Sequence, residues 1–372
     1  MMDSLFRRLN KSSLLLYLFF LKAFPAKKIK ESDGSILVVA DLFFGDLAMA
    51  GRLILKLKKE NPSRKIILLS KFNLSDAANL FELTVINADY LNWRILVELR
   101  KASPEGYGRV INIFSWKWLP LLEALPHGEL ISHLGGKPRS NRAISRIISI
   151  PEKPIPASMI MFDLLESSSK DAENIHLNSL SLSNRFSDLG EYLIIHIGTS
   201  HHARLWPLDL IKLLFSLCQI AQKTIVLTGF KQEDAYQNVL DQIVDEHRQK
   251  NKIVNLMSQT NLQELLELVS NAKGIVSVDT GIIHWARLFL VPNISLMGQS
   301  DNKLFGVISP YFKLSRSIAS EPLECQDKQT FHGIKINWVN TCARNECHLP
   351  SRLCFDGINR QQIEKDFFEL FG

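Results

Sequence analysis

Residues 274–298, GIVSVDTGIIHWARLFLVPNISLMG, constrain the fold of this chain more than any other stretch. The pattern predicts an apolar strand over 275–278, a turn, a helix over 282–290 and a second apolar strand over 293–297. Short strands without polar alternation are typical of parallel sheets that are buried on both faces. The stretch therefore indicates an open α/β sheet, and such sheets bind ligands at the carboxyl ends of their strands.

A polar turn, Asp279-Thr280-Gly281, follows the first of these strands. Because a helix N-terminus offers unpaired N–H groups and the positive end of the helix dipole, we expect this turn to bind a diphosphate. The alternative is structural: Asp279 would cap the helix and Gly281 would allow close packing. His284 falls on the first helical turn, near the same expected ligand, although a lone histidine on a helix is more often structural.

Two series of alternating strands and helices indicate two domains. The first series has apolar strands at 35–40 and 65–70 with a helix between them, and the second opens with a strand at 192–197. The Ser- and Asn-rich stretch 167–190 has no sustained period and is typical of a linker. We therefore expect an α/β fold of two Rossmann-like domains facing a central cleft.

The chain of 372 residues is too long for one ordinary core. In the second series we expect further helices and strands, whereas residues 115–160 are predicted to be irregular. The patterns predict five segments: a basic and apolar N-terminal arm (1–34), an N-terminal Rossmann-like domain (35–170), a linker (171–190), a C-terminal Rossmann-like domain (191–355) and a C-terminal helix (356–372). The later elements of the second series are helices at 208–222, 232–248 and 262–271 and strands at 224–228 and 253–255.

The net charge of +6 resides entirely in the N-terminal arm. Residues 1–30 hold seven basic residues and one acidic residue, so the rest of the chain is neutral and the charge does not indicate a nucleic-acid-binding protein. The apolar run at 14–21 is shorter than the ~20 residues of a membrane-spanning helix. It is compatible with a helix on an anionic membrane surface, a helix packed on the protein, or a cleaved signal peptide.

Two further polar segments follow predicted strands. Asp46 either caps the helix that it begins or takes a proton from a substrate hydroxyl. The loop at 198–207, GTSHHARLWP, offers the hydroxyls of Thr199 and Ser200, main-chain N–H groups and the Arg204 cation. These are the groups that a diphosphate needs, and the alternative is a polar surface loop with a chance arginine.

Five cysteines, an odd count, fit a reducing compartment, and Cys218 falls within an apolar helical pattern. Four thiols near the C-terminus have the number of ligands that a metal ion needs, but no C-x2-C pair is present, so we expect free thiols and leave a metal site open. No GxGxxG follows a strand, which disfavours a dinucleotide-dependent dehydrogenase. The four late cysteines are Cys325, Cys342, Cys347 and Cys354.

The combination of these segments resembles the family-nine glycosyltransferases, the lipopolysaccharide heptosyltransferases. ILVVADLFFGDLAMAGRLILKLKKENP is similar to the N-terminal signature of that family, and GTSHHARLWP is similar to its donor loop. SVDTGIIHWARLFLVPNISLMG is similar to its best-marked segment, D-[ST]-G-x-x-H followed by an apolar strand ending in Gly. The resemblance is strong over 190–300 and clear over 35–70.

The resemblance implies the GT-B fold and an inverting, metal-independent transfer of a sugar from a nucleotide diphosphate, without a cofactor. The N-terminal domain would bind the acceptor and the C-terminal domain the nucleotide sugar. Asp46 matches the family's general base. The donor contacts of the family match Thr199, Ser200, Arg204, Asp279, Thr280, Gly281 and His284.

By the same resemblance the donor is ADP-heptose and the acceptor a lipopolysaccharide or related envelope glycan. The expected location is the cytoplasm, with peripheral contact to the inner membrane. Ala40 and Gly51-Arg52 depart from the family's pattern on the acceptor side, which leaves the acceptor open, and the basic residues at 137–153 fit either a phosphorylated acceptor or a solvated face. The alternative functions are a GT-B-type nucleotide-sugar epimerase and a non-catalytic nucleotide-binding scaffold at the membrane.

Overall fold

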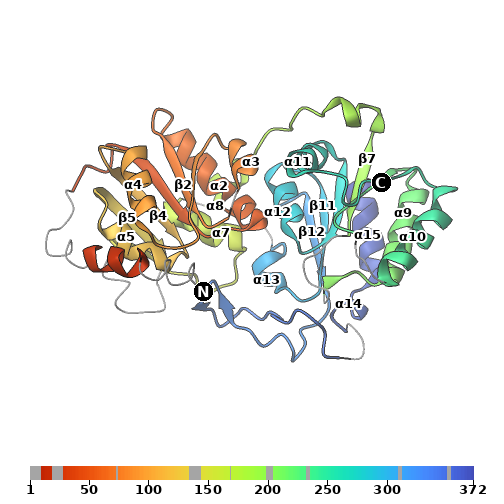
Figure 1. Ribbon diagram of the computed structural model, residues 1–372. Coiled ribbons are helices and arrows are strands. Elements are labelled where there is room, and N and C mark those ends of the chain that lie inside the picture. The colour runs from red at the N-terminus through yellow and green to blue at the C-terminus, as the bar shows by residue number, and fades with distance from the viewer. Residues whose placement is uncertain are drawn as a thin grey trace. The chain divides into compact units, whose positions relative to one another are not determined.

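The computed structural model describes residues 10–18, 28–72, 74–133, 144–167, 169–197, 204–231, 235–308, 312–349 and 353–372. The chain forms two compact units, each built around one six-stranded parallel sheet with helices on its faces (Figure 1). These sheets confirm the predicted α/β fold. The first unit comprises Met1–Pro151, Ile160–Ala172 and His332–Ile334, and the second comprises Glu152–Met159, Glu173–Phe331 and Lys335–Gly372.

The first sheet has the order β3-β2-β1-β4-β5-β6, and every neighbouring pair is parallel. All six residues of β1 are buried, as an apolar strand at the centre of such a sheet requires. Its strands are β1 (Ser35–Ala40), β2 (Ile66–Ser70), β3 (Thr84–Asn87), β4 (Tyr107–Ile113), β5 (His127–His133) and β6 (Arg146–Ile148). Its helices are α2 (Phe44–Glu60), α3 (Ser75–Asn79), α4 (Trp93–Ala102) and α5 (Leu119–Glu123), and the helices α7 (Ala157–Phe162) and α8 (Ser169–Glu173) each have residues in both units.

The prediction that residues 115–160 are irregular is wrong. They include β5 and β6 of the first sheet and the helices α5 and α7. β5 reads HGELISH, and its polar residues hid the pattern of a buried strand although Leu130 and Ile131 are fully buried. Its place in the sheet comes from pairing with β4 and β6, which a local pattern does not reveal.

The part of the N-terminal arm that the structure describes, residues 10–18, is helical and packs on the first unit. Leu14 and Leu18 are buried in that unit's core, and Trp93 donates a hydrogen bond from Nε1 to Oγ of Ser13 at 3.1 Å. This is the packed helix among the three alternatives. Leu15 and Leu16, at 36% and 59% exposed, face away from the core. None of the helices in the described ranges is long and apolar enough to cross a membrane.

The second sheet has the order β12-β11-β10-β7-β8-β9 and is likewise parallel throughout. The predicted bounds of β8, β9, β11 and α11 match the structure, whereas β12 was not predicted. Its strands are β7 (Tyr192–His196), β8 (Thr224–Thr228), β9 (Ile253–Asn255), β10 (Gly274–Val278), β11 (Asn293–Met297) and β12 (Ser315–Ala319). Its helices are α9 (Leu208–Ile220), α10 (Ala235–Arg248), α11 (Leu262–Asn271), α12 (Gly281–Leu288), α13 (Asn302–Phe305), α14 (Leu353–Asp356) and α15 (Arg360–Phe371).

The C-terminal helix α15 completes the core of the second unit. Ile363, Phe367 and Phe371 are buried in the same hydrophobic cluster as the central strands. Phe371 packs so closely on Gly274, the first residue of β10, that a Cβ there would overlap its ring. A side chain larger than hydrogen is therefore excluded at that position unless the helix moves.

The segment from Glu173 to β7 belongs to the second unit. Leu177 donates its backbone N–H to the carbonyl of Leu288 at 2.9 Å, and Leu180 donates its own to Oγ of Ser270 at 3.0 Å. Asn271 donates a hydrogen bond from Nδ2 to the carbonyl of Leu180 at 2.7 Å. Most of the stretch 171–190 thus lies along α11 and α12.

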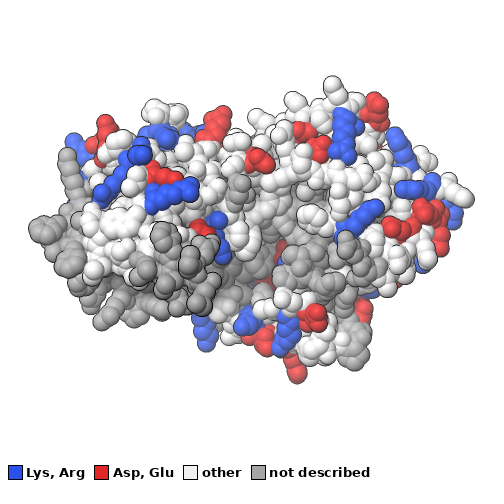
Figure 2. Space-filling view, in the orientation of Figure 1, with Lys and Arg blue, Asp and Glu red and all other residues white. Residues whose placement is uncertain are grey.

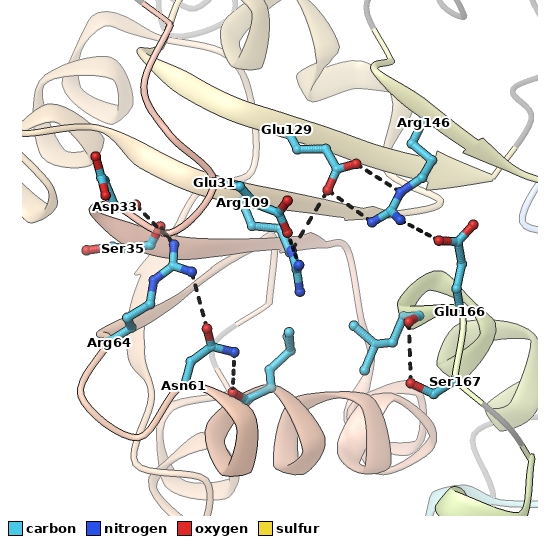
Figure 3. A network of polar contacts seen from close by, with 12 residues as sticks. Glu31, Asp33, Ser35, Asn61, Arg64, Arg109, Glu129, Arg146, Glu166 and Ser167 are labelled. Atoms are coloured by element: carbon cyan, nitrogen blue, oxygen red, sulfur yellow. Dashed lines mark hydrogen bonds and ion pairs between the residues drawn. The ribbon is translucent and has the colours of Figure 1, made fainter.

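Charged residues of both signs are interspersed on the face of the molecule in Figure 2. One polar network of the first unit pairs Arg146 with Glu129 at 2.9 Å and with Glu166, and Arg109 with Glu31 (Figure 3). Arg146 belongs to the basic segment at 137–153, and these carboxylates neutralise it. Lys137, Arg139 and Arg142 of that segment lie outside the described residues.

Candidate active site

Both sheets have the same strand order. In each sheet, successive strands of the chain are first added on one side and then on the other, and the change of side occurs at one pair of neighbouring strands. These pairs are β1 and β4 in the first unit and β7 and β10 in the second. In doubly wound sheets, ligands bind at the carboxyl ends of the strands at such a point. All the predicted site residues that the structure describes follow β1, β7 or β10. Thr199 and Ser200, in the loop after β7, lie outside the described residues.

Asp46 is the third residue of α2 and is partly exposed. Its Oδ2 atom accepts a hydrogen bond from the backbone N–H of Phe43, the N-cap residue, at 3.0 Å. The capping role considered for Asp46 is therefore present in the structure. It does not exclude the role of a base, because an ionised carboxylate has two oxygens and about four lone-pair sites.

Asp41 fixes the chain between β1 and α2, just before Asp46. Its carboxylate lies 3.0 Å from Nζ of Lys117 and accepts a hydrogen bond from Nε1 of Trp118 at 3.3 Å. Its backbone N–H donates to Oγ of Ser115, which follows β4, at 2.7 Å. The ends of β1 and β4 are thus tied together at the edge where Asp46 stands.

In the second unit, the N-terminus of α12 is left open by its own N-cap residue. Thr280 is that N-cap, and its side chain makes no capping hydrogen bond. Its hydroxyl lies instead 3.1 Å from Oγ of Ser277 in β10. Because the first N–H groups of a helix have no partner within the helix, those of Gly281 and Ile282 are groups that could bind an anion.

Asp279 is a buried carboxylate beside this helix end, only 8% exposed. Its Oδ1 atom lies 3.5 Å from Nε2 of His284 but completes no hydrogen bond with the described residues. Burial opposes ionisation of Asp279, but the His284 imidazole, the Arg204 guanidinium and the Ser300 hydroxyl outweigh it and lower its pKa to about 2. A buried anion with an unused oxygen is well suited to accept a hydrogen bond from a ligand hydroxyl.

Arg287, which the sequence did not single out, supports His284 from within α12. Its NH1 atom lies 3.5 Å from Nδ1 of His284, and its NH2 atom donates to Oγ of Ser295 at 3.0 Å. Because a guanidinium only donates, Nδ1 of His284 is the acceptor and Nε2 carries the proton that faces Asp279. The signal that was available is spacing: residues 284 and 287 share one helix face.

Arg204 lies between β7 and α9 and reaches the same edge. Its NH1 atom lies 3.5 Å from the carbonyl of Asp279, and its Nε donates to Oε1 of Gln299 at 3.1 Å. Gln299 is 5% exposed and was not predicted, although it directly follows the strand–Gly segment of β11. The second unit therefore gathers five of the predicted donor residues at one edge, namely Arg204, Asp279, Thr280, Gly281 and His284.

Comparison with known proteins identifies the fold and the family. The structure is similar to a family 9 glycosyltransferase from Veillonella parvula (TM-score 0.65, 15% identity, covering 93% of this chain and 99% of that chain). It is also similar to the E. coli ADP-heptose lps heptosyltransferase II (TM-score 0.61, 17% identity, 91% and 98%) and to E. coli heptosyltransferase WaaC with ADP (TM-score 0.56, 19% identity, 76% and 92%). No curated protein sequence matches the chain.

These structural matches confirm the predicted GT-B fold, the architecture of many nucleotide-sugar glycosyltransferases. The family model of glycosyltransferase family 9 (heptosyltransferase) matches residues 137–335, which is more than half of the chain. The protein belongs to glycosyltransferase family 9, and it is a glycosyltransferase.

Proposed function

We propose that this glycosyltransferase transfers a heptose from ADP-heptose to a hydroxyl group of a lipopolysaccharide or related envelope glycan, with inversion and without a metal ion in the reaction. The observation that supports it most is the donor edge of the second unit: an uncapped helix N-terminus, the Arg204 cation and the unused buried oxygen of Asp279. Family membership supports the reaction class, and the similar WaaC structure contains ADP.

The chemistry assigns a separate task to each group. The acceptor oxygen attacks the anomeric carbon of the donor sugar, the bond from that carbon to the diphosphate oxygen breaks, and ADP leaves. Negative charge grows on the departing diphosphate, where Arg204 and the first N–H groups of α12 stabilise it. Asp279 accepts a hydrogen bond from a hydroxyl of the donor sugar. Asp46 takes the proton of the acceptor hydroxyl.

The site residues suit this reaction without a catalytic metal, because cationic and N–H groups fill the role that a metal would have at the diphosphate. Attack on the face opposite the leaving group gives the inverted anomer. A carboxylate such as Asp46 then needs to act only as a base and never as a nucleophile.

A lipid-linked acceptor would bring the protein to the inner membrane from the cytoplasmic side. The exposed side chains of Leu15 and Leu16 and the basic residues of the arm support such peripheral contact. The contact would be superficial, since Leu14 and Leu18 of the same helix are committed to the core of the first unit.

The test is titration of the purified protein with a panel of nucleoside diphosphates, followed by turnover of nucleotide sugars with and without acceptor. We expect ADP to bind more tightly than UDP or GDP and ADP-heptose to be consumed only when a glycan acceptor is present. Consumption without acceptor would indicate the epimerase alternative, and binding without consumption would indicate the scaffold. Preference for another nucleotide would overturn the ADP assignment.

A further inference from the structure

Four of the five cysteines gather around one small cavity of the second unit. We call them the cysteine cluster. The cavity has a volume of about 20 Å³, room for one ion or water molecule, and His348 lines it as well. The fifth cysteine, Cys218, is buried in α9 and does not reach it. The members of the cysteine cluster are Cys325, Cys342, Cys347 and Cys354.

The cluster is assembled from separate parts of the chain, each held by its own contacts. Cys342 donates its backbone N–H to the carbonyl of Gln299 at 2.9 Å. Arg344 donates from NH1 to the carbonyl of Cys325 at 2.6 Å. Cys354 lies on α14, whose Phe355 packs against Gly298, where a Cβ would stand 2.6 Å from its ring. The convergence of four thiols is therefore a product of tertiary structure rather than of a local sequence pattern.

The four thiols share the lining of this one cavity with Gln299 and Arg344. No three of the described His, Cys, Asp or Glu side chains are already closed around a single point. Three members of the cluster, however, lie in segments without helix or strand.

We propose that the cysteine cluster binds one transition-metal ion of the zinc or iron class through four thiolates. Four sulfur ligands in tetrahedral arrangement are the donor set that these ions occupy in structural sites. Binding replaces the thiol protons with the metal and changes no oxidation state, so it requires no further reactant. The ion has a structural role, separate from the metal-free transfer proposed above.

The metal site is connected to the donor edge through one side chain. Gln299 donates from Nε2 to the carbonyl of Arg344 at 2.6 Å, and Nε2 lies 3.8 Å from Sγ of Cys342. The other end of the same amide accepts the hydrogen bond from Arg204. The ion thus holds the segment around Cys342 that orients Gln299, and Gln299 positions Arg204 for the diphosphate. This second step rests on the proposed donor role of Arg204.

Metal content measured on the purified full-length protein tests the site without reference to activity. After expression in medium containing zinc and iron salts, elemental analysis should find about one zinc or iron ion per chain. Cys342→Ser and Cys347→Ser should each lose most of it, whereas Cys218→Ala, the matched control, should retain it. Cys347 is exposed, so its variant is the less disruptive of the two.

Two results would overturn the metal site. One is a wild-type protein without metal in which five free thiols react under denaturing conditions. The other is a pair of disulfide bonds within the cluster, detected by mass spectrometry before reduction. Either result leaves the proposed transferase function standing, because neither measurement involves a nucleotide.

Titration with ADP tests the connection to the donor edge. In Cys347→Ser the dissociation constant for ADP should rise by at least about fivefold relative to Cys218→Ala, a typical size for coupling between sites. A metal-free variant with unchanged ADP affinity would overturn the positioning step. If wild-type protein holds the metal but binds no nucleoside diphosphate, the proposed function fails while the metal site stands.

Discussion

Oε1 of Gln299 lies 3.1 Å from Nε of Arg204, and the other end of the same amide donates to the carbonyl of Arg344. This buried glutamine therefore touches both Arg204 and the cysteine-containing segment of the second unit. Its position makes Arg204 a fixed cation rather than a mobile one. Fixed charges stabilise a developing anion without the cost of reorganisation at the moment of reaction.

Gln299→Ala should weaken ADP binding by about 1 kcal/mol, the value of one hydrogen bond that orients a charged group. The reason is that Arg204 loses its anchor but keeps its charge. Calorimetric titration measures the change, with Gln259→Ala, an exposed glutamine of the same unit, as the control. Equal affinities for the two variants would show that Arg204 is positioned by other contacts.

Arg204→Ala should weaken ADP binding more than Gln299→Ala does, by about 1.5–3 kcal/mol, because it removes a charge-assisted contact to the diphosphate. Arg248→Ala provides the control, since Arg248 is an exposed arginine of α10 that pairs with Asp245 on its own helix. The same titration applies. An unchanged dissociation constant would remove Arg204 from the donor site.

Asp46→Asn should abolish transfer while ADP affinity stays the same. Asparagine keeps a side-chain oxygen that accepts the hydrogen bond from Phe43, so the helix cap survives and only the base is lost. Asp76→Asn, also an acidic residue in the first turn of a helix of this unit, is the control. Turnover near the wild-type rate in Asp46→Asn would leave Asp46 as a cap alone.

Asp279 should make unfolding depend on pH in the acid range. Its folded pKa of about 2 is below that of an unfolded aspartate, so the ionised form contributes stability above pH 4 that is lost as the pH falls toward 2. The lost stability should amount to about 2 kcal/mol. Urea unfolding between pH 6 and pH 2.5 measures this loss. In Asp279→Asn the free energy of unfolding should depend less on pH over this range, whereas the exposed control Asp245→Asn should keep the dependence of the wild type. Parallel slopes for all three proteins would contradict the assignment.

The two faces of the N-terminal helix should have different roles: the buried face stabilises the first unit, and the exposed face contacts an anionic membrane. Leu14→Ala should destabilise the first unit by about 2–5 kcal/mol, because it leaves a cavity in the core. The double change Leu15→Ser, Leu16→Ser should leave stability within about 0.5 kcal/mol and reduce binding to anionic vesicles. Vesicle co-sedimentation decides the second point: undiminished binding would exclude this face as the membrane contact.

Elements that lie within a strong local pattern could be predicted almost to the residue. α11 begins at the Asn261–Glu264 capping box and presents one apolar face, and the apolar run of β11 has the bounds that its sequence indicates. β5 was missed because its polar residues are tolerated only through pairing with strands on both sides. That pairing is a property of the assembled sheet.

The contrast between local sequence pattern and tertiary contact also applies to the candidate site residues. Asp279, Thr280 and Gly281 could be predicted because a polar turn after an apolar strand has one place in a parallel sheet. Gln299 and Arg287 could not, because their importance depends on which side chains the fold brings within reach of them. The cysteine cluster is the extreme case: its spacing lacks the pattern of a local metal site, and only the tertiary structure brings its members to one cavity.

The packing of Phe371 against Gly274 has a consequence for synthesis of the protein. The sheet that carries the donor edge cannot complete its core until α15 has emerged from the ribosome, more than 90 residues after β10 begins. The first unit, whose strands are contributed by residues 35–148, can form its sheet long before that point. The second unit would therefore be the last to mature on the ribosome, and truncation before α15 should leave β10 exposed to aggregation rather than yield a smaller folded unit.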